Sequence, residues 1–238
     1  MTGVEWVVAV SAVAVGACAQ GSLGFGLGMV AAPVLALTDP DFIPGPLLIV
    51  AMLLTLMVAF GERGGIDWKG LRWAIVGRVP GSVLGTAAVV VLPERGLIVL
   101  FAVLVLIGVG LSAAGWRVDP NRVSLFSAGA ASGFMGSITS IGGPPMALLY
   151  QHRRGPELRA TLAGFFVFGS TLSISLLLLA GEMGTADIGR AGILAPAMLL
   201  GFGASRRLAP YLDRGFMRPA LLAFSAATSV LLLVIELF

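Results

Sequence analysis

Short polar stretches divide this chain into apolar segments, and most of these segments have the length of a bilayer crossing. Six have close to the roughly 20 residues that cross a bilayer as a helix. They are residues 42–60, 71–92, 96–115, 158–180, 188–205 and 217–237. Of the 238 residues, 58% are hydrophobic and 11% are charged, whereas soluble domains carry about 25% charged residues. One core cannot bury so much apolar surface, so the sequence predicts an all-α polytopic membrane protein.

Two further segments are too long for one crossing and carry helix breakers in their middle. Residues 4–37 are interrupted by QGSLGFGLG at 20–28, and residues 123–150 are interrupted within SGFMGSITSIGGPPMALLY at 132–150. Glycine and proline break helices. We therefore expect each segment to form two short helices joined by a turn.

The charges of the loops predict how the chain is oriented. Basic loops favour the cytoplasmic side, and residues 62–72, 116–122, 151–159 and 206–218 are basic. The loops at 38–41, 93–95 and 181–187 are then outside. Segment 123–150 has cytoplasmic loops at both ends, so it is expected to be a re-entrant hairpin. Segment 4–37 would be the matching hairpin from outside, with both termini outside a multi-pass protein of the cytoplasmic membrane.

The two broken segments resemble each other. Residues 21–37 align with 133–149 at a constant offset, and PGSVLG at 80–85 echoes PAMLLG at 196–201. We predict two inverted repeats, 1–116 and 117–238, each a broken hairpin plus three transmembrane helices. Chance similarity between segments rich in glycine and alanine is the alternative. Inverted repeats with broken helices are typical of secondary transporters, whose substrate binds near the midplane.

The composition of the two breaks favours an anion. Helix N-termini at a break present free N–H groups and the positive ends of helix dipoles, and hydroxyls add donors. The candidate site residues are Gln20, Gly21, Ser22, Gly24, Gly26 and Pro33 in the first break, and Gly136, Ser137, Thr139, Ser140, Gly142, Gly143 and Pro144 in the second. Gln20 either binds the ligand or satisfies backbone groups freed by the break.

Arg78 is the candidate cation. It lies six residues past Arg72, so a helix would place it roughly 9 Å deeper. It either attracts an anion or extends its side chain to the cytoplasmic interface. His152, the only histidine, is interpreted as a solvated loop residue rather than as a titrating group of the site.

Other classes of function find little support. No Asp or Glu lies deep in a predicted span, so we expect export without a carboxylate relay. No catalytic dyad or metal motif is present at membrane depth, and Ser140 has no nearby base. We therefore expect no enzyme activity, no cofactor, no metal and no nucleic-acid partner. The partners are a small anion and the bilayer, and a homodimer stays open.

Three features resemble the sulfite exporter TauE/SafE family of membrane permeases. They are the glycine-rich break followed by proline in both halves, the PxxxxG pattern at 80–85 and 196–201, and SRRLAPYLDRGFMR at 205–218. The likeness covers nearly the whole chain. It implies export of sulfite, sulfoacetate or a similar organosulfonate by alternating access. A permease for another small organic anion or a neutral solute is the alternative.

Overall fold

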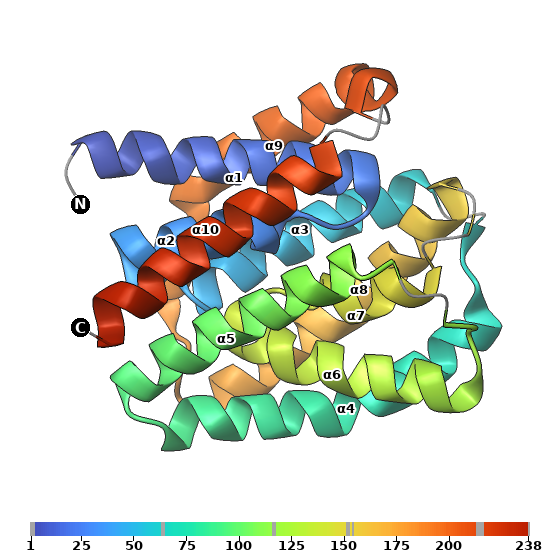
Figure 1. Ribbon diagram of the computed structural model, residues 1–238, viewed down its shortest axis with the longest axis horizontal. Helices are drawn as coiled ribbons and strands as arrows, with labels where there is room; N and C mark the ends of the chain where they lie inside the picture. Colours follow the sequence, from blue (N-terminus) through green and yellow to red (C-terminus); the bar gives the residue numbers. More distant parts are fainter. Residues whose placement is uncertain are drawn as a thin grey trace.

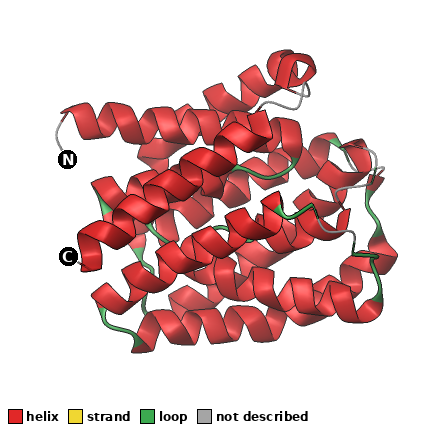
Figure 2. Ribbon diagram, viewed as in Figure 1, coloured by secondary structure: helices red, strands yellow, loops and turns green. Residues whose placement is uncertain are grey.

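The computed structural model describes residues 3–62, 65–115, 118–150, 153, 155–212 and 217–237. All regular structure in these ranges is helical (Figure 2). The elements are α1 (Gly3–Leu23), α2 (Leu27–Thr38), the 3-10 helix η1 (Pro40–Phe42), α3 (Gly45–Gly61), α4 (Trp68–Val91), α5 (Glu94–Ala113), α6 (Arg122–Thr139), α7 (Gly143–Tyr150), α8 (Gly155–Leu179), α9 (Thr185–Leu212) and α10 (Met217–Leu237).

Seven segments are long and apolar enough to cross a bilayer. They are α1, η1 together with α3, α4, α5, α8, α9 and α10. This confirms the prediction of an all-α polytopic membrane protein. Side chains cap the N-termini of α4 and α6: the Asp67 side chain accepts from Gly70 N at the start of α4, and Asn121 forms a capping box with Ser124 at the start of α6.

The two broken segments are hairpins with unequal arms. The first arms, α1 and α6, have 21 and 18 residues, and the second arms, α2 and α7, have 12 and 8. At 1.5 Å per residue, α1 is about 32 Å long and α7 about 12 Å. The expected pair of short helices is therefore one long arm and one short arm in each half, because each helix continues through the first glycines of its break.

In each hairpin, the turn between the two arms contains residues whose backbone lies in the left-handed region. In the first hairpin Gly24 and Gly26 have φ values of 86° and 142°, and in the second Ser140 has a φ of 59°. Glycine adopts such values without steric cost, whereas serine does so rarely. The two breaks are thus confined to residues 24–26 and 140–142.

Glycines bring some helix backbones into direct contact. A Cβ atom on Gly77 of α4 would lie 2.0 Å from the carbonyl oxygen of Phe126 in α6, and one on Gly129 would lie 2.1 Å from that of Ala74. On α9, a Cβ on Gly201 would lie 2.0 Å from the carbonyl oxygen of Ala14 in α1. Small residues permit this close packing of membrane helices.

The packing partners exchange between the two halves. If α1–α5 correspond to α6–α10, the contact of α4 with α6 corresponds to that of α9 with α1, and both contacts are present. The same holds for α5 with α7 and α10 with α2, and for α4 with α8 and α9 with α3. This pattern supports the division into repeats 1–116 and 117–238, which stays a prediction.

Both chain ends lie at the same end of the molecule (Figure 1). The connection from α4 to α5 lies there too, and α4 begins at the opposite end. This alternation agrees with the arrangement of the loops expected from their charges. Which end faces the cytoplasm stays a prediction of the positive-inside rule.

Candidate functional site

The two breaks meet at a small cavity. The space for the centres of water-sized spheres is ≈ 40 Å³, which is room for about three water-sized groups. The lining residues come from both hairpins and from α3, α4 and α8: Gln20, Phe25, Gly26, Gly28, Met29, Leu48, Ala51, Thr55, Arg78, Gly136, Ser140, Ile141, Gly142, Gly143, Phe166 and Ser170.

Arg78 brings a positive charge to this cavity. Its side chain is only 2% exposed, so it does not reach the interface as one sequence reading expected. Nη1 donates to Ser132 Oγ at 2.7 Å, and the guanidinium carbon lies 5.1 Å from the centre of the Phe165 ring. Nε has no partner, and among the described residues no carboxylate forms an ion pair with Arg78. A buried cation without an acidic partner is costly, and an anion in the cavity would offset that cost.

Three glycines make room for the guanidinium. A Cβ on Gly136 would lie 2.8 Å from Nη2, one on Gly142 would lie 2.8 Å from Nη1, and one on Gly169 would lie 2.5 Å from Cζ. These distances are shorter than real Cβ contacts, so a side chain at any of these positions in α6, the second break or α8 would force the guanidinium to move. Gly169 was not among the predicted site residues, since it stands in an unbroken helix.

Backbone N–H groups at the second break also lack acceptors among the described residues, so they too can donate hydrogen bonds to an anion. The first N–H groups of any helix lack an intrahelical acceptor, and two of those in α7 are replaced by prolines, which have no N–H. Gly143 therefore carries the first N–H of this helix. No described residue accepts a hydrogen bond from the N–H of Gly142. The α7 N-terminus thus adds its positive dipole end beside Arg78.

The first break contributes less to the donor set. Gln20 Oε1 accepts from Leu27 N at 3.1 Å, so it satisfies the N-terminus of α2. Its amide nitrogen has no partner among the described residues, and Gln20 lines the cavity. The oxygen thus satisfies a backbone group freed by the break, and ligand binding by the amide nitrogen stays a prediction.

Ser170 is a donor that sequence reasoning missed. It is 5% exposed, lines the cavity, and its hydroxyl forms no hydrogen bond with any described residue. It follows Gly169 in an ordinary apolar helix, FFVFGSTLS at 165–173, where no breaker marks a site. The apolar wall formed by Phe25, Met29, Leu48 and Phe166 also has no sequence signature, because such residues are common in every membrane helix.

The structure brings together half of the predicted site residues and places the rest elsewhere. Gln20, Gly26, Arg78, Gly136, Ser140, Gly142 and Gly143 line the cavity. The other predicted residues of the second break are engaged in the helix or in packing. Ser137 Oγ is 2.8 Å from Ser173 Oγ, Thr139 donates to Met135 O, and Pro144 packs on Gly108.

The remaining predicted residues of the first hairpin pack against neighbouring helices. Ser22 donates to Cys18 O, and Pro33 is buried within α2. Gly21 lies against Ser205 of α9, and Gly24 lies against Arg159 of α8. His152 lies outside the described residues.

A second, larger cavity of ≈ 470 Å³ lies toward the end that carries the termini. Its polar lining is mainly acidic, with Asp41, Glu94, Glu182 and Asp187 against one cation, Arg190. A hydrogen bond links the linings of the two cavities: Ser140, in the lining of the small cavity, donates through Oγ to Pro44 O at 3.0 Å, and Pro44 lines the larger cavity.

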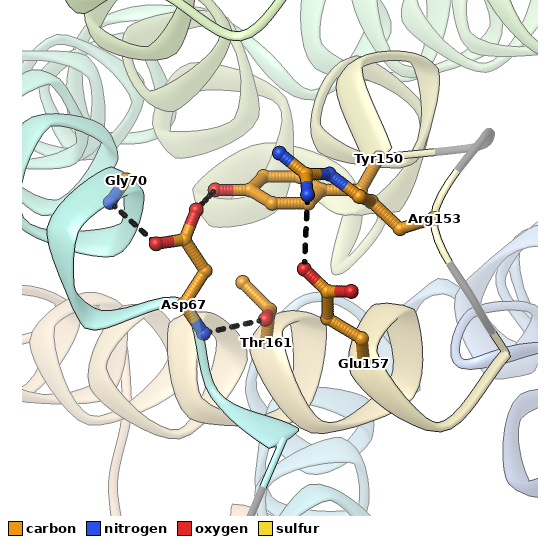
Figure 3. A network of polar contacts seen from close by, with 6 residues as sticks. All are labelled: Asp67, Gly70, Tyr150, Arg153, Glu157 and Thr161. Carbon is orange, nitrogen blue, oxygen red and sulfur yellow. Dashed lines mark hydrogen bonds and ion pairs between the residues drawn. The ribbon is translucent and has the colours of Figure 1, made fainter.

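Polar contacts close the opposite end. Asp67 accepts from the Tyr150 hydroxyl at 3.1 Å, and its N–H donates to Thr161 at 3.0 Å (Figure 3). Arg159 forms an ion pair with Glu62 at 2.8 Å. Tyr150 ends α7 outside the seven apolar spans. Its burial, and then the charge of Asp67, raise its pKa, so the phenol keeps its proton and donates. These contacts join α4, α7 and α8 on the side away from the larger cavity.

The comparison with known proteins agrees with the geometry. The family model described as Sulfite exporter TauE/SafE matches residues 8–232. No curated protein and no solved structure matches the chain. The family model covers nearly all of the seven apolar spans, both breaks and the arginine between them. The chain is therefore a membrane transporter that belongs to the sulfite exporter TauE/SafE family.

Proposed function

We propose that the chain exports a small sulfur-containing anion across the cytoplasmic membrane. Sulfite, sulfoacetate or a similar organosulfonate would bind in the cavity between the two breaks. The observation that carries this proposal is Arg78, a buried guanidinium that lines the cavity and has no acidic partner among the described residues. A cation or neutral solute would leave that charge uncompensated.

The size of the cavity favours a compact anion. Room for about three water-sized groups suits the sulfur and oxygens of sulfite. A longer organosulfonate needs the cavity to widen along its apolar wall. That wall, with Phe25 and Phe166, is the one feature that favours the second candidate, a small organic anion with an apolar group.

Alternating access is the proposed mechanism. The larger cavity would be the outer vestibule, and the contact of Ser140 with Pro44 would be the outer barrier. At the inner end, the contacts of Asp67 with Tyr150 and of Arg159 with Glu62 would break to admit the anion from the cytoplasm. One hydrogen bond at the outer barrier against several polar contacts at the inner end supports a state that opens more easily to the outside.

The membrane potential is the proposed energy source. An inside-negative potential drives an anion out with about 2.3 kcal/mol per charge per 100 mV. The residues that line the small cavity include no Asp or Glu that could carry a coupled proton. Strict dependence of transport on a proton gradient at fixed voltage would contradict this part of the proposal.

Transport in proteoliposomes tests the proposal. Purified protein would be reconstituted, and efflux would be measured for sulfite, sulfoacetate, taurine, sulfate and lactate at a set potassium diffusion potential. We expect sulfite to be transported, with sulfoacetate slower because of its length. Equal transport of taurine, which has no net charge, or transport of none of the anions would reject the proposed function.

A further inference from the structure

Ser132 joins two parts of the site through its hydroxyl. It lies in α6, is 0% exposed, and its hydroxyl makes two hydrogen bonds to distant groups. It accepts from Arg78 Nη1 at 2.7 Å and donates to the carbonyl oxygen of Gly142. A buried serine in a membrane helix commonly donates its hydroxyl hydrogen bond to the backbone carbonyl one turn earlier in the same helix. Ser132 instead links the cation of α4 to the break before α7.

The second bond of Ser132 fixes the direction of a peptide group. In a trans peptide the C=O and the following N–H point in opposite directions. Because the Gly142 carbonyl points toward Ser132, the N–H of Gly143 points away from Ser132. Gly143 lines the cavity and carries the first N–H of α7. One hydroxyl thus determines the orientation of both the guanidinium and this peptide.

The orientation of Arg78 depends on few other contacts. Among the described residues, Ser132 is the one hydrogen-bond partner of its side chain, and the three surrounding glycines offer no side chain to hold it. The Phe165 ring contact contributes no hydrogen bond. Without the Ser132 hydroxyl, the cation would keep its charge and lose its fixed direction.

We propose that Ser132 is a positioning residue for anion binding, which aligns Arg78 and the Gly142–Gly143 peptide toward one anion. This inference rests on the proposed function of the cavity. Ser132 does not line the cavity and does not contact the anion itself. It acts through the two groups that do, so its loss should weaken binding while the fold and the transport cycle remain.

The test measures sulfite binding and sulfite transport for Ser132→Ala, with Ser173→Ala as the matched control. Ser173 is also 0% exposed, and it also joins two helices through its hydroxyl, which lies 2.8 Å from Ser137 Oγ. Bonds to charged groups contribute enough that we expect the Kd and KM for sulfite to rise about tenfold in Ser132→Ala. The maximal rate should fall less, and Ser173→Ala should bind sulfite as the unmodified chain does.

A double-mutant cycle distinguishes positioning from general damage. In the Arg78→Gln background, Ser132→Ala should change sulfite affinity clearly less than it does in the unmodified chain, because the cation that it aligns is gone and only the Gly142–Gly143 peptide is left to align. If the two effects multiply instead, Ser132 acts independently of the cation and the inference is wrong. Ser132→Cys fills the same place with a slightly larger thiol that is a poor hydrogen-bond partner, so it gives the same readout if the alanine variant does not fold.

The outcomes separate this inference from the proposed function. If the unmodified chain binds sulfite and Ser132→Ala binds it equally well, only the role of Ser132 falls. If the unmodified chain binds no anion of the panel, the proposed function falls and the inference falls with it. A rise in Kd that also occurs in Ser173→Ala would indicate loss of packing and would contradict positioning.

Discussion

Replacement of Arg78 by glutamine should weaken anion binding without weakening the fold. Two unit charges about 4 Å apart interact with about 4 kcal/mol at an effective dielectric constant of about 20. Loss of that attraction corresponds to about a thousandfold in affinity, and the exchange of a charged for a neutral hydrogen bond alone to about tenfold. We therefore expect the Kd for sulfite to rise by at least about tenfold.

The thermal stability of Arg78→Gln tests the same reasoning independently of binding. An arginine held by a carboxylate stabilises a fold, whereas Arg78 has an unbonded Nε and is buried. Removal of an unpaired buried charge is neutral or stabilising. Without anion, the melting temperature of Arg78→Gln should equal or exceed that of the unmodified chain. With sulfite at 100 times its Kd, only the unmodified chain should gain about 2.7 kcal/mol of stability.

A thermal-unfolding assay in detergent, with and without sulfite, measures both effects. Arg72→Gln is the matched control, because it removes one charge from the same helix at an exposed position. It should leave the sulfite-induced shift in melting temperature unchanged. The reasoning is refuted if Arg78→Gln keeps that shift, or if it unfolds at a clearly lower temperature without anion.

Three further variants test other parts of the structure. Gly169→Ala should raise the KM for sulfite more than tenfold, since its Cβ would occupy guanidinium space, while Gly189→Ala, where nothing lies within 4 Å, should leave transport unchanged. Gly77→Ala should destabilise the contact of α4 with α6 by about 1–3 kcal/mol, seen as a lower melting temperature, and an unchanged melting temperature would contradict the backbone contact. Tyr150→Phe removes one hydrogen bond of the inner barrier and should increase the labelling of cysteines introduced at the cytoplasmic end. Unchanged labelling would show that this bond does not hold the barrier closed.

Much of the fold could be predicted because its cause is local. The apolar spans follow from hydropathy and length, and the two breaks follow from glycine and proline runs. The exact residues of each break could not be predicted, since Gly136 continues α6 while Ser140 takes the left-handed conformation. Ser137 and Thr139 differ from Ser140 only in lying before that turn. The hydroxyls of Ser137 and Thr139, which lie within the helix, bond to neighbouring protein groups. Ser140, which lies at the turn, lines the cavity.

The role of Arg78 depends on which side of α4 it occupies. Its depth along the helix could be counted from Arg72, and that depth allowed both a ligand contact and an extension to the interface. The choice is made by packing: Gly77 and Gly81 press α4 against α6, which turns Arg78 inward toward Ser132. A sequence read one helix at a time does not contain that rotation.

The predicted repeat also explains why the cation could not be found by symmetry. Pro80 aligns with Pro196, so the counterpart of Arg78 is Leu194, which is 0% exposed in the apolar core. The exchange of packing partners between the halves requires small residues in both copies, and in this register Gly81 and Gly85 of α4 correspond to Ala197 and Gly201 of α9. A second buried arginine would instead place two like charges near one small anion, which would disfavour the unloaded state further. The helix packing can therefore follow the two-fold symmetry of the predicted repeats while the positive charge of the site comes from one repeat alone.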